Sequence, residues 1–217
     1  MPVERAAVVI PDDLILGWRG VLGRSSESER VMADLAGRYD EPHRRYHGVS
    51  HLVHVVRRVG DLLDGDVGGI APSEEEAIVL AAWFHDAIYD PRAGDNERRS
   101  SDLAAQALHR LGVAQPLIDA VDRLVMATRE HRPTCLDEAV LLDADLAVLG
   151  AEPSVYDDYV AGVRAEYAHV GEEGWRTGRA QVLVRFLATP VFTTPAAARR
   201  NAQAAANLAR ELAALPI

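Results

Sequence analysis

Residues 78–90 read Ile-Val-Leu-Ala-Ala-Trp-Phe-His-Asp-Ala-Ile-Tyr-Asp, an apolar run that is interrupted by a histidine and an aspartate at positions 85 and 86. The run follows Ser73-Glu74-Glu75-Glu76, a capping-box pattern, so we expect a helix from about Glu74 to Ile88. His85 and Asp86 would then lie deep in an apolar helix. Because burying an unpaired carboxylate is costly, Asp86 needs a cation, a dense set of hydrogen bonds or an ion pair with an arginine.

Helical spacing of apolar residues continues on both sides of this stretch, and alternating strand patterns are nearly absent. Asp12 or Asp13 can cap a first helix, and Ser26 with Glu29 forms a capping box for a second. The predicted helices cover residues 14–22, 26–41, 49–63, 74–88, 97–111, 116–128, 136–149, 154–170, 175–188 and 195–215, with a loop over 65–72. We therefore expect one all-α domain over residues 1–217, with helical extensions at both ends.

The charge of the chain argues against several functions. Acidic residues outnumber basic ones by 33 to 23, a net charge of −10, which disfavours non-specific binding of nucleic acid. All 23 basic residues are arginines, so a Schiff-base lysine, a pyridoxal-phosphate lysine and a P-loop are excluded. A small anionic substrate stays compatible with this composition, because a bound metal and a few arginines can invert the local field.

The cysteine content and the apolar runs indicate the compartment. Cys135 is the single cysteine, so an intrachain disulfide and a cysteine-rich zinc site are excluded. No apolar run approaches the length of a membrane span, and residues 1–11 lack the basic-then-apolar order of a secretory signal. We therefore expect a cytoplasmic protein without a membrane partner.

Histidines gather in a second segment, Tyr46-His47-Gly48-Val49-Ser50-His51, which is followed by His54. Spacings of four and three residues place the three imidazoles on one face of a helix that begins early enough. Valines and leucines flank that face, so the imidazoles need partners, and a cation is one way to supply them. The alternative is a set of surface or capping histidines.

A third segment, residues 141–149, again places carboxylates inside an apolar helical run. Asp143 and Asp145 cannot share a helix face at a spacing of two residues, so one should point inward and the other toward solvent or a neighbouring backbone. A half-buried carboxylate paired with an arginine explains this segment equally well. Two imidazoles and two carboxylates together would suit a divalent iron, manganese, nickel, magnesium or zinc ion.

An early histidine, a later His-Asp pair and a distant aspartate, in that order, resemble the HD superfamily of metal-dependent phosphohydrolases, closest to a bacterial branch of it. The resemblance implies an HD-like helical bundle, with a metal-binding core over residues 42–150 and accessory C-terminal helices over 153–215. It implies that His51 is the first metal ligand and that His85 and Asp86 form the doublet. Asp145 is then the last ligand, with Asp143 as the alternative.

This resemblance implies hydrolysis of a phosphomonoester or phosphodiester of a small nucleotide-like substrate, with the metal as Lewis acid. The Tyr-His-x-x-x-His opening is similar to that of cyclic-nucleotide phosphodiesterases, which makes His47 the candidate proton donor to the leaving oxygen. Glu97 is a second acid–base candidate, although a first-turn acid of a helix explains it equally well. His131, Arg45 and Arg129 are candidate substrate-binding residues.

Two other functions stay open. A minority of the superfamily uses a second iron and oxygen, and in such a di-iron oxygenase His54, His131 or Glu97 would supply the extra ligands. A non-catalytic nucleotide sensor would keep the metal pocket without turnover. A thiol nucleophile at Cys135 receives little support, because nothing orients it toward His131. The helices from Ser154 onward either cover the pocket or form a homodimer interface.

Overall fold

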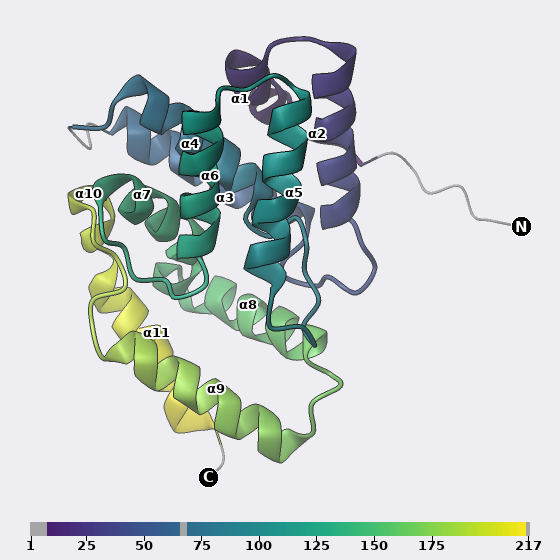
Figure 1. Cartoon of the computed structure of the whole chain (residues 1–217). Helices are drawn as coiled ribbons and strands as arrows, with labels where there is room; N and C mark the ends of the chain where they lie inside the picture. Colours follow the sequence, from purple (N-terminus) through teal and green to yellow (C-terminus); the bar gives the residue numbers. More distant parts are fainter. Residues whose placement is uncertain (1–7, 66–68, 216–217) are drawn as a thin grey trace, which may run out of the picture.

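The computed structural model describes residues 8–65 and 69–215, which form helices and connecting loops (Figure 1). This part of the chain contains eleven α-helices, one 3-10 helix and no strand, so the predicted all-α fold is confirmed. The helices are α1 (Asp12–Leu22), α2 (Ser26–Tyr39), α3 (Val49–Asp64), α4 (Pro72–Phe84), α5 (Asn96–Arg110), α6 (Gln115–Ala127), α7 (Leu136–Asp145), η1 (Leu146–Gly150), α8 (Pro153–Glu166), α9 (Glu172–Leu187), α10 (Pro195–Ala198) and α11 (Asn201–Ala214). The segment 1–11 and the predicted loop over 65–72 lie partly outside the described residues.

The predicted helix starts all lie within three residues of the observed ones, and two of them show the local reason for a difference. Ser25, rather than Ser26, caps α2, because its side chain accepts a hydrogen bond from the backbone N–H of Ser28 at 3.0 Å. Helix α4 begins at Pro72, where the missing N–H of proline costs no helical hydrogen bond. Glu74 supports this start, since its carboxylate accepts from the backbone N–H of Ala71 at 2.6 Å.

The end of α4 differs more from the prediction, because the helix stops at Phe84 and not at Ile88. Side chains from distant segments form hydrogen bonds with the backbone groups that would otherwise have continued the helix. Arg44 donates to the carbonyl of Asp86 at 2.7 Å, and the Ser100 hydroxyl accepts from the N–H of Ile88 at 3.0 Å. The His-Asp pair therefore lies where the chain leaves the helix, and not within it.

The predicted helix over 195–215 is two helices, α10 and α11, with a break at residues 199 and 200. Asn201 uses both atoms of its amide on the backbone of Phe192, accepting from the N–H at 2.9 Å and donating to the carbonyl at 2.8 Å. This long-range pairing begins α11 as a separate element. The helix predicted over 136–149 likewise divides, with α7 ending at Asp145 and η1 continuing from Leu146.

Helix α4 lies at the centre of the core. All its residues from Ala77 to Phe84 except Val79 are buried, and it contacts α1, α3, α5, α6 and α7. Trp83 meets Trp18 of α1 edge to face, with ring centroids 5.1 Å apart. Burying one large apolar side chain contributes about 1.5–3 kcal/mol. Because α4 buries several such side chains against five other helices, it contributes a large part of the apolar burial that stabilises the fold.

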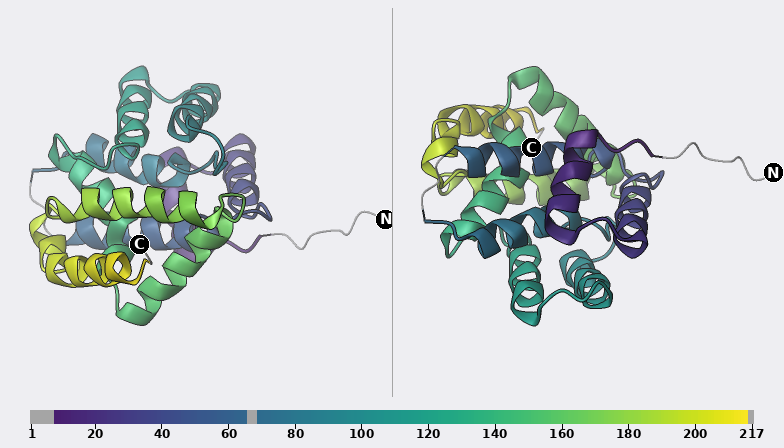
Figure 2. Two further views of the ribbon diagram at one scale, coloured as in Figure 1. Left: turned by 90° about the horizontal axis from the view of Figure 1, so that it is seen from below. Right: turned by 90° about the horizontal axis from the view of Figure 1, so that it is seen from above.

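The C-terminal helices cover one side of the bundle. Figure 2 shows α9 running across that side, with α8 and α11 beside it, while α1 and α2 lie on the opposite side. Asn207 of α11 donates to the carbonyls of Leu149 and Ala151, at 3.0 and 2.8 Å, and so joins this layer to η1. Within the residues described, no helix has the length and apolar character needed to cross a bilayer.

Candidate metal centre

Two imidazoles from different helices meet inside the fold. His51 comes from the first turn of α3, and His85 follows the last residue of α4. Their Nε2 atoms lie 3.1 Å apart, and both residues are buried, with 3 % and 1 % of their surface exposed. Two ring nitrogens this close need either a shared proton or a common cation between them.

Two carboxylates complete the cluster. Asp86 Oδ2 lies 3.5 Å from His51 Nε2 and 3.4 Å from His85 Nε2, and Asp145 Oδ1 lies 3.3 and 3.6 Å from the same atoms. Ligands bound at about 2.0–2.2 Å from one ion are separated by roughly 2.9–3.6 Å, which matches these distances. His51, His85 and Asp145 offer ligand atoms within 4.8 Å of one another, so this buried group could hold a metal ion.

Neighbouring hydrogen bonds fix the protonated nitrogen of His85 and the position of Asp86. His85 Nδ1 lies 2.9 Å from the carbonyl of Ala82, and because a carbonyl only accepts, Nδ1 carries the proton and Nε2 is left with its lone pair. The Tyr39 hydroxyl accepts from the backbone N–H of Asp86 at 3.2 Å and donates to the carbonyl of Trp83 at 3.3 Å. These contacts hold the His-Asp pair in place.

Arg44 links the two ligand-bearing segments. Its side chain is fully buried, and its guanidinium donates to the carbonyl of His47 at 3.0 Å and to those of Asp86 and Ala87 at 2.7 and 3.2 Å. Its ion pair with Glu41 balances the charge at 3.1 Å. The buried arginine therefore joins the backbone before α3 to the backbone after α4.

The carboxylates and imidazoles of the cluster shift one another's pKa values. Burial alone would raise the pKa values of Asp86 and Asp145, but the imidazoles, with His131 as the strongest contact of Asp145, hold both carboxyl pKa values well below the usual range. Burial would likewise lower the pKa of His51, but its contacts with Asp145 and Asp86 raise it. The ionised carboxylates thus favour a positive charge on the imidazoles between them, and a divalent cation would supply that charge in place of the protons.

The two carboxylates of the cluster, those of Asp86 and Asp145, line a cavity of about 580 Å³. His47, Glu97, Arg129 and His131 line the same cavity, as the sequence analysis required of substrate-binding or acid–base residues. His131 Nε2 lies 3.1 Å from Asp145 Oδ2. Its backbone is left-handed, with φ 51°, a conformation that is strained for a residue other than glycine and that often marks functional sites.

Glu166 is a residue that the sequence analysis missed. It ends α8, its side chain is fully buried, and its Oε2 accepts from His47 Nδ1 at 2.7 Å and from the Tyr89 hydroxyl at 2.9 Å. Its Oε1 accepts three consecutive backbone N–H groups, those of Arg45, Tyr46 and His47, at 2.7–2.9 Å. No local signal could indicate this role, because the partners lie 77 to 121 residues away in the sequence.

Three predicted residues lie apart from the cluster. Arg45 lines a second cavity, of about 750 Å³, that shares only Tyr89 with the first. The carboxylate of Asp143 accepts from the backbone N–H groups of Thr193 and Thr194 at 2.7–3.2 Å. These hydrogen bonds satisfy the buried carboxylate, so Asp143 has a structural role. His54 is exposed on α3 and belongs to no group of metal-ligand atoms among the residues described.

Comparison with protein-family models, with curated proteins and with solved structures finds no match to this chain. The chain is therefore characterised by its own geometry, as an all-helical protein with a buried His/His/Asp cluster at the wall of a cavity.

Proposed function

We propose that the protein is a metal-dependent phosphohydrolase that cleaves a phosphomonoester or phosphodiester of a small organic molecule. The observation that carries this proposal is the convergence of His51, His85, Asp86 and Asp145 on one point beside a cavity. Two imidazoles and two carboxylates form a mixed nitrogen and oxygen set that suits divalent iron, manganese, nickel, magnesium or zinc. The order of these residues along the chain resembles the HD superfamily, which supports the same reaction class.

A cation held there would polarise a phosphoryl oxygen and lower the pKa of a coordinated water. The side chains of the protein have separate tasks. Arg129, which lines the cavity, pairs with the phosphoryl oxygens of the substrate. His47 gives a proton from Nε2 to the leaving oxygen, while Glu166 holds its Nδ1–H and fixes the orientation of the ring. Glu97, on the same cavity wall, is the alternative acid or base.

One contact favours a second candidate function, a di-iron oxygenase. Asp145 directs Oδ1 to His51 and His85 and Oδ2 to His131, so its carboxylate would offer one oxygen to each of two ions. Glu97 lines the same cavity and would supply a further oxygen ligand. The number of metal ions in each chain separates the two candidates.

Elemental analysis of the purified protein tests the proposal, with His85→Ala and Asp86→Ala as the variants. We expect about one transition metal ion in each chain of the wild type and a loss of that ion in both variants. His54→Ala is the matched control, because His54 is exposed and lies outside the cluster, and it should retain the metal. About two ions in each chain would favour the oxygenase.

Hydrolysis is then measured with p-nitrophenyl phosphate and bis(p-nitrophenyl) phosphate in the presence of manganese, iron, nickel, cobalt or magnesium. We expect turnover that is lost in His85→Ala and kept in His54→Ala. A wild-type protein that holds no metal after supplementation would refute the metal centre. A protein that holds one metal and binds phosphate esters without turnover would instead be a sensor.

A further inference from the structure

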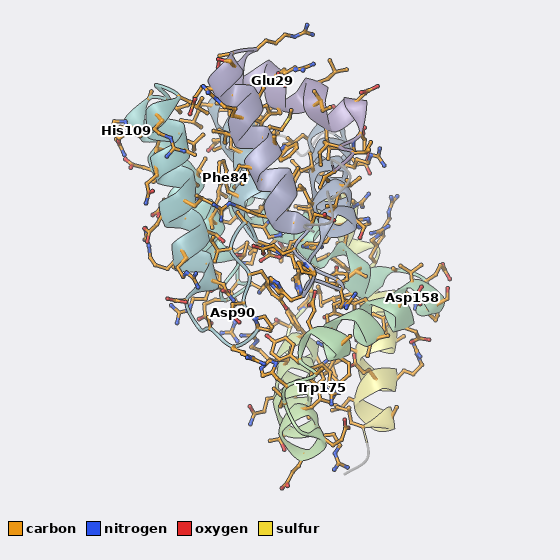
Figure 3. All side chains as sticks on the ribbon, turned by 90° about the vertical axis from the view of Figure 1, so that its right-hand side faces the viewer. Glu29, Phe84, Asp90, His109, Asp158 and Trp175 are labelled. Carbon is orange, nitrogen blue, oxygen red and sulfur yellow. The ribbon has the colours of Figure 1, made fainter. Side chains whose placement is uncertain are left out.

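The cavity beside the metal centre has a second, apolar wall that comes from the C-terminal helices. Helix α8, helix α9 and the turn between them contribute Val163, Tyr167, Val170, Trp175, Val182 and Phe186. The Tyr167 and Trp175 rings lie near each other, with centroids 5.9 Å apart, and Phe186 meets the ring of His131 edge on at 5.9 Å. In Figure 3, Trp175 lies on this lower layer, toward the end of the molecule away from Glu29.

Most hydrogen-bonding side chains around the cavity already have protein partners. Asn96 uses both amide atoms on the backbone of Asp90, at 3.0 and 2.9 Å, and the Thr128 hydroxyl donates to the carbonyl of Val125 at 2.7 Å. Arg179 pairs with the carboxylate of Glu211 through two nitrogens, at 2.7 and 2.9 Å. The edges of a nucleobase or the hydroxyls of a sugar would therefore find few free partners here.

The cationic side chains that remain suit a single phosphoryl group. Among the residues described, Arg129 and Arg185 line the cavity and have no carboxylate partner, although the Arg185 guanidinium lies over the Phe186 ring at 5.3 Å. Glu97, an acidic residue, also lines it. Two guanidiniums can pair bidentately with the oxygens of one phosphoryl group bound beside the metal centre.

Helix α9 leaves space against this wall. Gly174 and Gly178 line the cavity one helical turn apart, and a Cβ added at Gly178 would meet no atom within 4 Å. The surface of α9 is therefore open at Gly178, between Trp175 and Val182 in the sequence, where a flat group can approach the helix backbone.

We propose that the organic group of the substrate is an apolar aryl or alkyl group, recognised by contact with Trp175, Tyr167 and Val182 and attached to a single phosphoryl group. This inference rests on the proposed function and puts an apolar organic group in place of the nucleotide-like one expected from the sequence. Apolar contact contributes affinity in proportion to the buried area, without the hydrogen bonds that a base or sugar requires.

The test measures binding of non-hydrolysable phosphonates to the metal-loaded protein by calorimetry. Phenylphosphonate should bind at least about tenfold more tightly than methylphosphonate, because only its ring reaches the apolar wall. It should also change the fluorescence of Trp175, since Trp18 and Trp83 are fully buried in the core. Trp175→Phe should remove that fluorescence change while binding continues.

Gly178→Leu fills the open space and should abolish the advantage of phenylphosphonate while leaving methylphosphonate affinity and metal content unchanged. The matched control is Gly17→Leu in α1, where an added Cβ also meets nothing within 4 Å and which lies outside the lining of the cavity beside the metal centre, and it should behave as wild type. Both changes favour the helix, so thermal melting should confirm that the variants fold.

Equal binding of the two phosphonates, or an unchanged preference in Gly178→Leu, would overturn the inference. Tighter binding of the phosphonate analogue of adenosine monophosphate than of phenylphosphonate would overturn it as well. These measurements need no turnover, so their outcome does not depend on whether the protein hydrolyses a phosphoester. A protein that binds phenylphosphonate as expected but hydrolyses no phosphoester would refute the function and leave the apolar recognition intact.

Discussion

Replacing Glu166 by glutamine would remove the negative charge from a buried carboxylate that accepts five hydrogen bonds. Burial alone would raise the pKa of this carboxyl, but the hydrogen bond and charge of His47 and the backbone N–H donors lower it from 4.5 to about 2. A glutamine can still accept from the backbone, but its NH₂ group cannot accept from His47 or from Tyr89. The variant therefore loses the ionised part of the network.

The stability that Glu166→Gln should lose follows from the lowered pKa of the Glu166 carboxyl. One pKa unit corresponds to about 1.4 kcal/mol, so a folded pKa about 2.5 units below that of the unfolded chain contributes roughly 3 kcal/mol of stability at neutral pH. Since the folded pKa is the lower one, this stability is complete above pH 4.5 or so and is lost as the pH falls toward 2. The difference in unfolding free energy between wild type and Glu166→Gln should therefore be largest at pH 7.

Urea unfolding followed by circular dichroism at pH 7, 5, 4 and 3 measures this difference. Glu173→Gln, an exposed position in the first turn of α9, is the control and should change stability little at any pH. We expect the gap between wild type and Glu166→Gln to narrow steadily below pH 5. A gap under about 0.5 kcal/mol at pH 7, or one that is the same at pH 7 and pH 3, would refute the reasoning.

The same variant tests whether Glu166 positions His47. With p-nitrophenyl phosphate as substrate, kcat should fall more than KM changes, because His47 loses the acceptor that holds Nδ1–H. Glu166→Asp keeps the charge and should restore part of kcat. Equal losses in kcat for Glu166→Gln and Glu166→Asp, at matched stability, would indicate a purely structural role.

Other substitutions have simpler outcomes. Asp143→Ala should lower the unfolding free energy by about 1–3 kcal/mol, because two backbone N–H groups lose their acceptor, and elemental analysis should still find the metal. Arg44→Ala should weaken metal affinity about tenfold or more in chelator competition, since the buried guanidinium joins the two ligand-bearing segments, whereas the exposed Arg30→Ala should not. Cys135→Ser should leave metal content and hydrolysis unchanged, because the exposed thiol lies outside the metal cluster and the cavity beside it. Treatment with a chelator should lower the melting temperature of the wild type and leave that of His85→Ala unchanged.

The all-α architecture was predictable because it follows from local patterns. Apolar residues at helical spacing, together with serine, acidic and proline signals at helix starts, placed most helices within a few residues of their observed bounds. The need of the His-Asp pair for partners was predictable for the same kind of reason, since charged groups that interrupt an apolar run must be compensated. His51 and His85 each lie within 3.6 Å of both Asp86 and Asp145, and metal binding by this set stays a prediction.

Long-range contacts set the features that the sequence could not indicate. Helix α4 stops at Phe84 because Arg44 and Ser100 take its next backbone groups. The spacing of Asp143 and Asp145 indicated that they point apart, but only the fold supplies their partners, the backbone of Thr193 and Thr194 for one and the imidazoles for the other.

The roles of α9 and Glu166 at the cavity also depend on long-range contacts. Helix α9 mixes glycine, tryptophan and arginine without an apolar stripe, so its pattern did not reveal that one face lines the cavity beside the metal centre. Glu166 was unremarkable in the sequence, because a carboxylate acquires its role from the donors that the fold brings to it. Periodicity and capping act over a few residues and can be read along the chain, whereas the partner of a buried charge is chosen by packing between segments far apart in sequence.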